Sequence, residues 1–284
     1  MDVTKKAIGM LDSGVGGLTV AREVMKTMPA EKIIYFGDTL HLPYGPKPKK
    51  DVKKYVYKII EYFKDRNVKT IILACNTATS MLLKEARKEI KMPMFGTIDG
   101  VAARVKSVSE NNKVGIIGTK GTINSNAYQE ALKREVTDFE IHAKACPKFV
   151  ELAEKGDFEG ENVEKIVKEY LLPIKEKGID TLVLGCTHYP YLMPVIKKVM
   201  GENVTLVNPA ETMAFRAKNI MAVRGMISGK HEEPINFNEH EFYVSDLNKV
   251  SMEFLNKGTN FLNLPHLDFE EHNIFDNKNK KVSY

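Results

Sequence analysis

The chain has 284 residues, of which 43% are hydrophobic and 28% charged, with a net charge of +5. Such a length can bury a large core and form two α/β units of roughly 100 residues, which excludes a miniprotein held together by disulfides. Three widely spaced cysteines are too few for a disulfide framework and indicate free thiols in a reducing compartment. No segment has the apolar length of a signal peptide or a membrane span. We therefore expect a soluble, cytoplasmic protein without a membrane partner.

The positive charge is mild and is partly concentrated in lysine runs at 47–54 and 278–281. No helix-turn-helix, zinc finger or aromatic RNA-binding motif accompanies these lysines. We interpret the runs as a solvated surface and a frayed tail, and we expect no nucleic-acid partner. A nucleic-acid-binding surface is the alternative.

Short apolar runs alternate along the chain with amphipathic segments rich in Lys and Glu. The apolar runs predict strands at 7–11, 32–36, 70–74, 94–97, 113–118, 139–143, 181–184, 204–207 and 241–244. The amphipathic segments predict helices at 18–27, 52–66, 78–90, 123–134, 149–154, 162–177, 191–200 and 211–223. This alternation predicts parallel sheets wrapped by right-handed crossover helices. A loop rich in Gly, Lys, His and Pro precedes the last strand.

The alternation restarts near residue 98, which indicates an internal duplication. We predict a first α/β domain from residues 1–97 and 208–284 and a second from residues 98–207. The separation of Cys75 and Cys186 is close to the length of one unit, which supports the duplication. The predicted fold class is therefore α/β, with two similar doubly wound parallel-sheet domains that face each other across an active-site cleft.

Two apolar runs, TIILACNTAT at 70–79 and TLVLGCTHYP at 181–190, each lead into a cysteine. Ligands of parallel sheets bind beyond the carboxyl ends of the strands, so we expect both Cys75 and Cys186 in the cleft. Each thiol also precedes a predicted helix N-terminus, where backbone N–H groups lower the pKa of a thiol. For either cysteine alone, a small buried hydrophobic residue is the alternative.

A pair of thiols on opposite sides of a bound carbon can perform acid–base chemistry. One thiolate removes a proton from one face, while the opposite thiol delivers a proton to the other face. This pattern predicts racemisation or epimerisation. No pyridoxal-lysine motif is present to delocalise the carbanion, so the site must stabilise it by hydrogen bonds and exclusion of water. Asn76, Thr77 and Thr187, beside the cysteines, are the expected donors to the substrate carboxylate.

The segment LDSGVGG at 11–17 ends the first predicted strand with Asp12 and Ser13, followed by glycines that let the backbone approach a ligand closely. A dinucleotide cofactor is disfavoured because Thr19 replaces the third glycine of G-x-G-x-x-G. A tight turn with Asp12 as a helix cap is the alternative. Asp38, Tyr44 and Gly45, which could also contact a ligand, lie in the loop after the second predicted strand, where a simple turn would also explain them.

Six motifs in chain order resemble glutamate racemase, a cofactor-independent family that supplies D-glutamate for bacterial cell walls. They are DSGVGG at 12–17, PYG at 43–45, ACNTAT at 74–79, GTKGT at 118–122, CPKFVELAE at 146–154 and GCTHYP at 185–190. The resemblance covers about residues 7–224. It implies an amino-acid racemase that acts on L- and D-glutamate, needs no cofactor or metal, and forms a homodimer.

The resemblance also implies roles for individual residues. Cys75 and Cys186 are implied as the acid–base thiols, the first acting on D-glutamate and the second on L-glutamate. Asp12 and His188 are implied as auxiliary groups that tune the thiols. Glu154 corresponds to the glutamate that ends the family's C-P-x-F-V motif. The implied substrate contacts are Asp12, Ser13, Tyr44, Gly45, Asn76, Thr77, Thr119, Thr122, Thr187 and His188.

Other functions fit parts of the same pattern. Cys146, Cys186 and His188 could hold zinc, although no C-x-x-C spacing accompanies them. Cys75 and Cys186 could instead form a redox pair, and His188 alone could be a core histidine. An aspartate racemase or another isomerase of the superfamily could use the same scaffold, but such relatives usually carry an acidic residue in place of His188. A binding role, such as the regulatory association with DNA gyrase in some relatives, is a further class.

Overall fold

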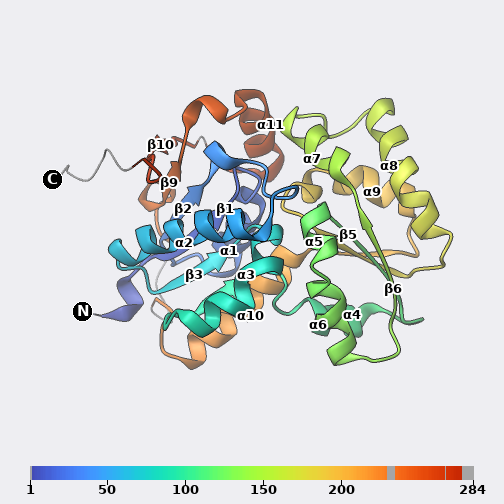
Figure 1. The fold of residues 1–284 in the computed structure, drawn as a ribbon, viewed down its shortest axis with the longest axis horizontal. Coiled ribbons are helices and arrows are strands. Elements are labelled where there is room, and N and C mark those ends of the chain that lie inside the picture. Colours follow the sequence, from blue (N-terminus) through green and yellow to red (C-terminus); the bar gives the residue numbers. More distant parts are fainter. Residues whose placement is uncertain (1, 229–233, 266, 277–284) are drawn as a thin grey trace.

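The protein, described by a computed structural model over residues 2–228, 234–265 and 267–276, contains two parallel β-sheets side by side (Figure 1). The first sheet has the strand order β10-β9-β2-β1-β3-β4 and the second β6-β5-β7-β8. The strands are β1 (Ile8–Asp12), β2 (Ile33–Gly37), β3 (Thr70–Leu73), β4 (Met94–Gly96), β5 (Lys113–Gly118), β6 (Glu140–Ala145), β7 (Thr181–Gly185), β8 (Thr205–Val207), β9 (Glu241–Val244) and β10 (Glu270–Glu271). All pairings between these strands are parallel, which confirms the predicted α/β class.

The two sheets share one topology, because the order β2-β1-β3-β4 of the first repeats as β6-β5-β7-β8 in the second. The direction of winding reverses between β1 and β3 in the first sheet and between β5 and β7 in the second. Loops diverge at such a switch point, and ligands bind there. Cys75 comes shortly after β3 and Cys186 directly after β7, so each cysteine lies at the switch point of its own sheet.

Helices cover both faces of each sheet (Figure 1). They are α1 (Leu18–Thr27), α2 (Lys49–Asp65), α3 (Asn76–Glu89), α4 (Val101–Val108), α5 (Lys120–Asn124), α6 (Ala127–Glu135), α7 (Pro147–Glu154), α8 (Glu161–Lys175), α9 (Met193–Met200), α10 (Pro209–Val223) and α11 (Met252–Leu262). On the first sheet, α1, α10 and α11 share one apolar core, while α2 and α3 share another. Side chains of β1 alternate between them, with Met10 in one core and Leu11 in the other. On the second sheet, α7, α8 and α9 pack in one core and α4 and α6 in another.

The C-terminal part of the chain returns to the first sheet. Strand β9 pairs with β2, and β10 pairs with β9. Helix α10 packs against α1, and α11 contributes Phe254 and Leu255 to the same core. This arrangement supports a first domain of residues 1–97 and 208–284 beside a second of residues 98–207, and the exact boundaries stay a prediction.

Most predicted strands and helices are confirmed to within a few residues, including the helix at 18–27 and the strand at 113–118. The single helix predicted at 123–134 is wrong. Helices α5 and α6 are separate there because Asn126, with a φ of 56°, adopts a left-handed conformation that interrupts a helix. The helix predicted at 191–200 begins with a 3-10 turn, Tyr189–Leu192, before α9.

Helices α4 and α11 and the short strand β10 are absent from the sequence prediction. Part of the predicted loop before β9, residues 229–233, lies outside the described residues, as do the tail lysines at 278–281. Among the helices that the structure describes, none is both long and apolar enough to cross a membrane.

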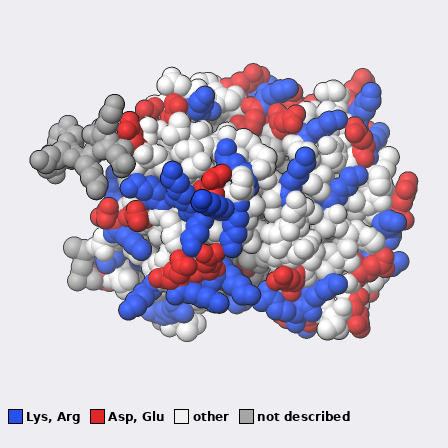
Figure 2. All heavy atoms as spheres, viewed as in Figure 1, with Lys and Arg blue, Asp and Glu red and all other residues white. Residues whose placement is uncertain are grey.

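Positive and negative side chains are interspersed over the face of the molecule shown in Figure 2. On α2, Lys49 and Lys53 form ion pairs with Glu85 of α3, and Lys53 also pairs with Glu89. Exposed ion pairs of this kind contribute little to stability, and they neutralise part of the lysine run. They support its interpretation as a solvated surface.

Candidate active site

Cys75 and Cys186 border the same small cavity, one from each sheet. Cys75 caps the N-terminus of α3, and Cys186 follows β7. Both side chains are nearly buried, with 5% and 6% of their surface exposed, and both are free thiols. The other lining residues are Ser13, Leu42, Pro43, Tyr44, Gly45, Asn76, Thr77, Thr119, Val150, Thr187 and His188. Three further residues of the predicted site, Asp12, Thr122 and Glu154, lie next to this lining.

The Cys75 thiol has a raised pKa, which favours its protonated form. Burial raises its pKa to about 12, and the nearby Asp12 carboxylate adds to the increase. The Ala78 N–H and the Ser13 hydroxyl act in the opposite direction, and Cys75 Sγ lies 3.7 Å from Ser13 Oγ. The N-terminus of α3 lowers the pKa of this thiol as predicted, but the net pKa is raised because desolvation outweighs the Ala78 N–H.

Asp12 ends β1 and holds the turn that leads into α1. Its Oδ2 atom accepts hydrogen bonds from the N–H groups of Gly17 at 2.9 Å and Gly14 at 3.2 Å. Its Oδ1 atom has no hydrogen-bond partner within the described part of the chain, and the residue is fully buried. Burial raises the pKa of Asp12 to about 6, although His188 and the Gly17 N–H lower it. Asp12 thus supports the turn and is also a titratable group near the Cys75 thiol.

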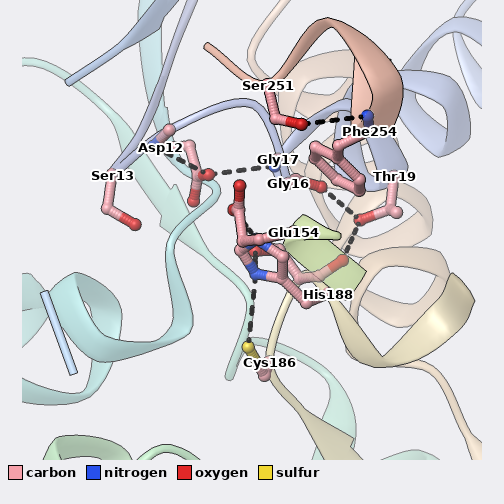
Figure 3. Close-up of polar contacts among 12 residues, drawn as sticks. Asp12, Ser13, Gly16, Gly17, Thr19, Glu154, Cys186, His188, Ser251 and Phe254 are labelled. Atoms are coloured by element: carbon pink, nitrogen blue, oxygen red, sulfur yellow. Dashed lines mark hydrogen bonds and ion pairs between the residues drawn. The ribbon is translucent and has the colours of Figure 1, made fainter. Parts of the chain in front are cut away.

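His188 connects Cys186 to Glu154 (Figure 3). Its Nδ1 atom lies 3.7 Å from Cys186 Sγ and 3.5 Å from Thr187 Oγ1, and its Nε2 atom lies 2.5 Å from Glu154 Oε1. Burial lowers the pKa of His188, but Glu154 and Cys186 raise it, and the balance holds this pKa well above its ordinary value. The raised pKa favours a positively charged imidazolium, which lies beside the Cys186 sulfur. The geometry supports an auxiliary function for both His188 and Glu154.

Three threonine hydroxyls join the loops of the two sheets. Thr77 Oγ1 lies 2.9 Å from Thr119 Oγ1 and 3.4 Å from Thr122 Oγ1. The Gly45 carbonyl accepts a hydrogen bond from the Gly121 N–H at 2.9 Å. A Cβ atom at Gly45 would lie 2.9 Å from the Cβ of Thr119, so this close approach requires glycine. Hydroxyl groups gathered in this way can bind a substrate carboxylate.

Two buried polar residues outside the lining, Asp38 and Tyr128, hold lining side chains in place, and the sequence indicates only Asp38. Asp38 accepts hydrogen bonds from the hydroxyls of Tyr44 at 2.6 Å and Ser245 at 2.9 Å. Tyr128 of α6 donates a hydrogen bond to the side chain of Asn76. The position of Asp38 directly after a strand indicates it in the sequence, but its partner Ser245, 207 residues away in the chain, has no such signal.

Cys146 is buried and is not among the residues that line the cavity. Its thiol lies 3.8 Å from the carbonyl of Lys144, and its own carbonyl accepts a hydrogen bond from the Tyr189 hydroxyl at 3.0 Å. In the part of the chain that the structure describes, no three His, Cys, Asp or Glu side chains are grouped as a metal site requires. The zinc alternative with Cys146, Cys186 and His188 therefore has no support from the geometry.

The geometry places the protein in a broad class. Two free thiols, at equivalent positions of a repeated α/β topology, border one cavity that also carries hydroxyl and amide groups. Such a site can remove a proton from one face of a bound carbon and supply a proton to another. It is the site of an α/β enzyme suited to acid–base chemistry at carbon.

Comparison with known proteins identifies the family within this class. Residues 17–217 match the family model described as Asp/Glu/Hydantoin racemase. The chain is also 39% identical over 266 residues to glutamate racemase from Listeria monocytogenes serotype 4a, an alignment that covers 94% of this chain and 97% of the relative. The chain therefore belongs to the Asp/Glu/Hydantoin racemase family and is an amino-acid racemase.

Solved structures agree with this assignment. A glutamate racemase isoform from Bacillus anthracis is similar with a TM-score of 0.87 at 35% identity, over 95% of this chain and 98% of that chain. Glutamate racemase from Francisella tularensis, in complex with D-glutamate, is similar with a TM-score of 0.85 at 32% identity, over 96% and 99% of the two chains. These similarities confirm the predicted fold class and the family resemblance.

Proposed function

We propose that the enzyme interconverts L-glutamate and D-glutamate without a cofactor, with Cys75 and Cys186 as its two acid–base groups. The observation that carries the proposal is that both thiols border one cavity from equivalent positions of the two sheets. The relatives named above are glutamate racemases, and one of them binds D-glutamate, which supports glutamate as the substrate.

Each direction of the proposed reaction moves one proton at a time. The Cys186 thiolate removes the α-proton of L-glutamate, the electron pair stays on the carbon, and the Cys75 thiol then protonates the opposite face. D-Glutamate follows the reverse path, with Cys75 as the base. The assignment of thiols to enantiomers follows the family resemblance. The raised pKa of Cys75 supports a resting state in which Cys75 carries its proton, and His188 Nδ1 lies 3.7 Å from the sulfur of Cys186, the second acid–base group.

The polar groups of the lining would bind the substrate and stabilise the carbanion. Asn76, Thr77, Thr119 and Thr187 present amide and hydroxyl groups to the cavity, and donors fixed before the reaction stabilise developing negative charge. The cavity has a volume of about 20 Å³, which is room for about one water molecule. Binding of glutamate therefore requires the two walls to move apart.

D-Glutamate made by this reaction would supply peptidoglycan synthesis, and we propose a homodimer in the cytoplasm on the same family resemblance. Racemisation of aspartate is the second candidate function. The matched family includes aspartate racemases by its description. His188, where such relatives usually carry an acidic residue, favours glutamate.

Polarimetry in deuterated water with the L- and D-forms of glutamate and aspartate tests the proposal. We expect the optical rotation of either glutamate enantiomer to decay to zero, with deuterium at the α-carbon by NMR. Activity should survive dialysis against a chelator and treatment with a carbonyl reagent. Turnover of aspartate alone would show that aspartate, and not glutamate, is the substrate. A failure of both amino acids to exchange the α-hydrogen would contradict racemisation by proton transfer.

A further inference from the structure

The imidazole of His188 is in contact with the C-terminal helix α11 (Figure 3). The rings of Phe254 and His188 are stacked, with centroids 5.8 Å apart and 21° between their planes. Both side chains are buried. Helix α11 packs on the first sheet, whereas His188 follows β7 of the second sheet. The contact therefore joins the C-terminal return of the chain to the part of the site that contains Cys186.

Phe254 has little freedom to move away from the imidazole. Its ring packs edge-on against Tyr191 at 5.1 Å and against Phe158 at 6.2 Å. Its backbone N–H donates a hydrogen bond at 3.2 Å to the hydroxyl of Ser251, which caps the N-terminus of α11. In a densely packed core, a ring held on several sides restricts the orientation of the ring stacked on it.

Further contacts fix the backbone and one edge of the imidazole. A Cβ atom at Gly16 would lie 2.6 Å from Cε1 of His188, so the turn after β1 passes close to the ring. The hydroxyl of Thr19 donates to the carbonyl of Thr187 at 3.0 Å and ties this segment to the start of α1. The stacked ring of Phe254 adds a contact with the face of the imidazole.

We propose that Phe254 is a positioning residue for proton transfer at Cys186. By restricting the plane of the imidazole, it keeps Nδ1 of His188 directed at the Cys186 thiol while Nε2 meets Glu154. Phe254 is not among the residues that line the cavity. The inference rests on the proposed two-thiol racemisation, and it gives α11 a function in the half-reaction of one thiol.

Deuterium isotope effects can separate the two half-reactions. With α-deuterated L-glutamate, Cys186 breaks the bond to deuterium. With α-deuterated D-glutamate, Cys75 breaks that bond and Cys186 acts in the protonation that follows. A substitution that slows only proton transfer at Cys186 makes cleavage of the bond to deuterium more rate-limiting for L-glutamate. For D-glutamate it makes that cleavage less rate-limiting. The isotope effects on kcat/KM should therefore change in opposite directions, whereas a smaller fraction of folded enzyme changes neither.

Substitution of Phe254 tests this expectation. Phe254→Leu removes the flat ring but keeps an apolar side chain, and Phe254→Tyr keeps the ring. We expect Phe254→Leu to lower kcat roughly tenfold, which is less than the about 10²–10⁴-fold contribution of a complete acid–base group. The isotope effect should rise for L-glutamate and fall for D-glutamate, and Phe254→Tyr should restore the wild-type values.

Phe261→Leu is the matched control. Phe261 lies on the same helix, and its ring packs on Tyr191 and Phe158 as that of Phe254 does. This variant should leave both isotope effects unchanged. The positioning function would be overturned if the two isotope effects of Phe254→Leu changed in the same direction or not at all. It would also be overturned if Phe261→Leu showed the same changes. If Phe254→Leu does not fold, Phe254→Met gives the same measurement. Failure of the wild-type enzyme to exchange the α-hydrogen would instead contradict the proposed function.

Discussion

Glu154 lies 2.5 Å from Nε2 of His188, and the same ring presents Nδ1 to Cys186 at 3.7 Å. Burial lowers the pKa of His188, and Glu154 is the strongest of the influences that raise it. Glu154 therefore controls the charge of the imidazole from the side of the ring that faces away from the thiol. A residue outside the cavity lining can in this way affect proton transfer within it.

Glu154→Gln should lower the pKa of His188, because the amide keeps the shape of the side chain and removes its negative charge. The alkaline loss of activity should then move to lower pH, since the imidazolium is lost earlier as pH rises. One pKa unit corresponds to about a tenfold change in the charged fraction. We expect kcat at pH 8 to fall roughly tenfold, measured from the pH profile of kcat between pH 6 and pH 10.

Glu151→Gln provides the control for the loss of a carboxylate from α7. Glu151 is exposed and lies on the same helix as Glu154. The control should keep the wild-type pH profile. A shift of the alkaline limb to higher pH in Glu154→Gln, or the same shift in both variants, would contradict the assigned function of Glu154.

Replacing either cavity thiol should abolish racemisation in both directions. A serine hydroxyl is far less acidic than a thiol, so neither Cys75→Ser nor Cys186→Ser retains a competent acid–base pair. Loss of a positioned acid–base group costs about 10²–10⁴-fold, and we expect kcat to fall at least a hundredfold for L- and D-glutamate alike. Polarimetry measures this loss, and circular dichroism checks that the fold is intact.

Cys146→Ala is the matched control for the thiol substitutions. Cys146 is also buried, in the same core of the second sheet as Phe149, but it is not among the residues that line the cavity. Its replacement should reduce stability slightly and leave kcat unchanged. Substantial racemisation by either single serine variant would rule out a mechanism that needs both thiols.

Thr77→Val should weaken the binding of L-glutamate and D-glutamate equally. Valine keeps the volume of threonine, but it removes the hydroxyl that lies 2.9 Å from Thr119 Oγ1 at the cavity. A hydrogen bond to a charged group contributes about 1.5–3 kcal/mol, so KM for each enantiomer should rise between about 10- and 150-fold. Thr77→Ser keeps the hydroxyl and should stay near the wild-type KM. An unchanged KM in Thr77→Val would remove Thr77 from the set of substrate contacts.

The residues at the strand ends could be predicted from the sequence because their placement depends on local pattern. An apolar run of strand length followed by Cys75 or Cys186 is enough to place each thiol at the carboxyl edge of a parallel sheet. The equal strand order of the two sheets then brings both thiols to corresponding switch points. Asp12 and Ser13 are placed by the same argument at the end of β1.

Contacts between distant segments could not be predicted in this way. The stacking of Phe254 on His188 has no local signal, and α11 itself contains Gly258, which disfavours a helix. The pKa of Cys75 shows the same limit. A helix N-terminus is visible in the sequence, but the burial that outweighs it depends on how both domains pack around the thiol.

Asp12 illustrates a conflict between stability and function. Its folded-state pKa of about 6 is higher than the ordinary value of 3.8 because burial disfavours the carboxylate. The folded protein thus holds this proton more tightly than the unfolded chain. The resulting stability is fully present below pH 3.8 and is lost as pH rises through 6.

Asp12→Asn should remove this pH-dependent loss while keeping an oxygen that accepts the hydrogen bonds from Gly17 and Gly14. Relative to wild type, its free energy of unfolding should increase by about 2–3 kcal/mol between pH 4 and pH 8, at 1.36 kcal/mol per pKa unit. Racemisation should fall at least tenfold, because the titratable group beside Cys75 is lost. Urea unfolding at the two pH values, with the exposed Asp65→Asn as control, measures the difference. An equal destabilisation at both pH values would show that Asp12 only supports the turn.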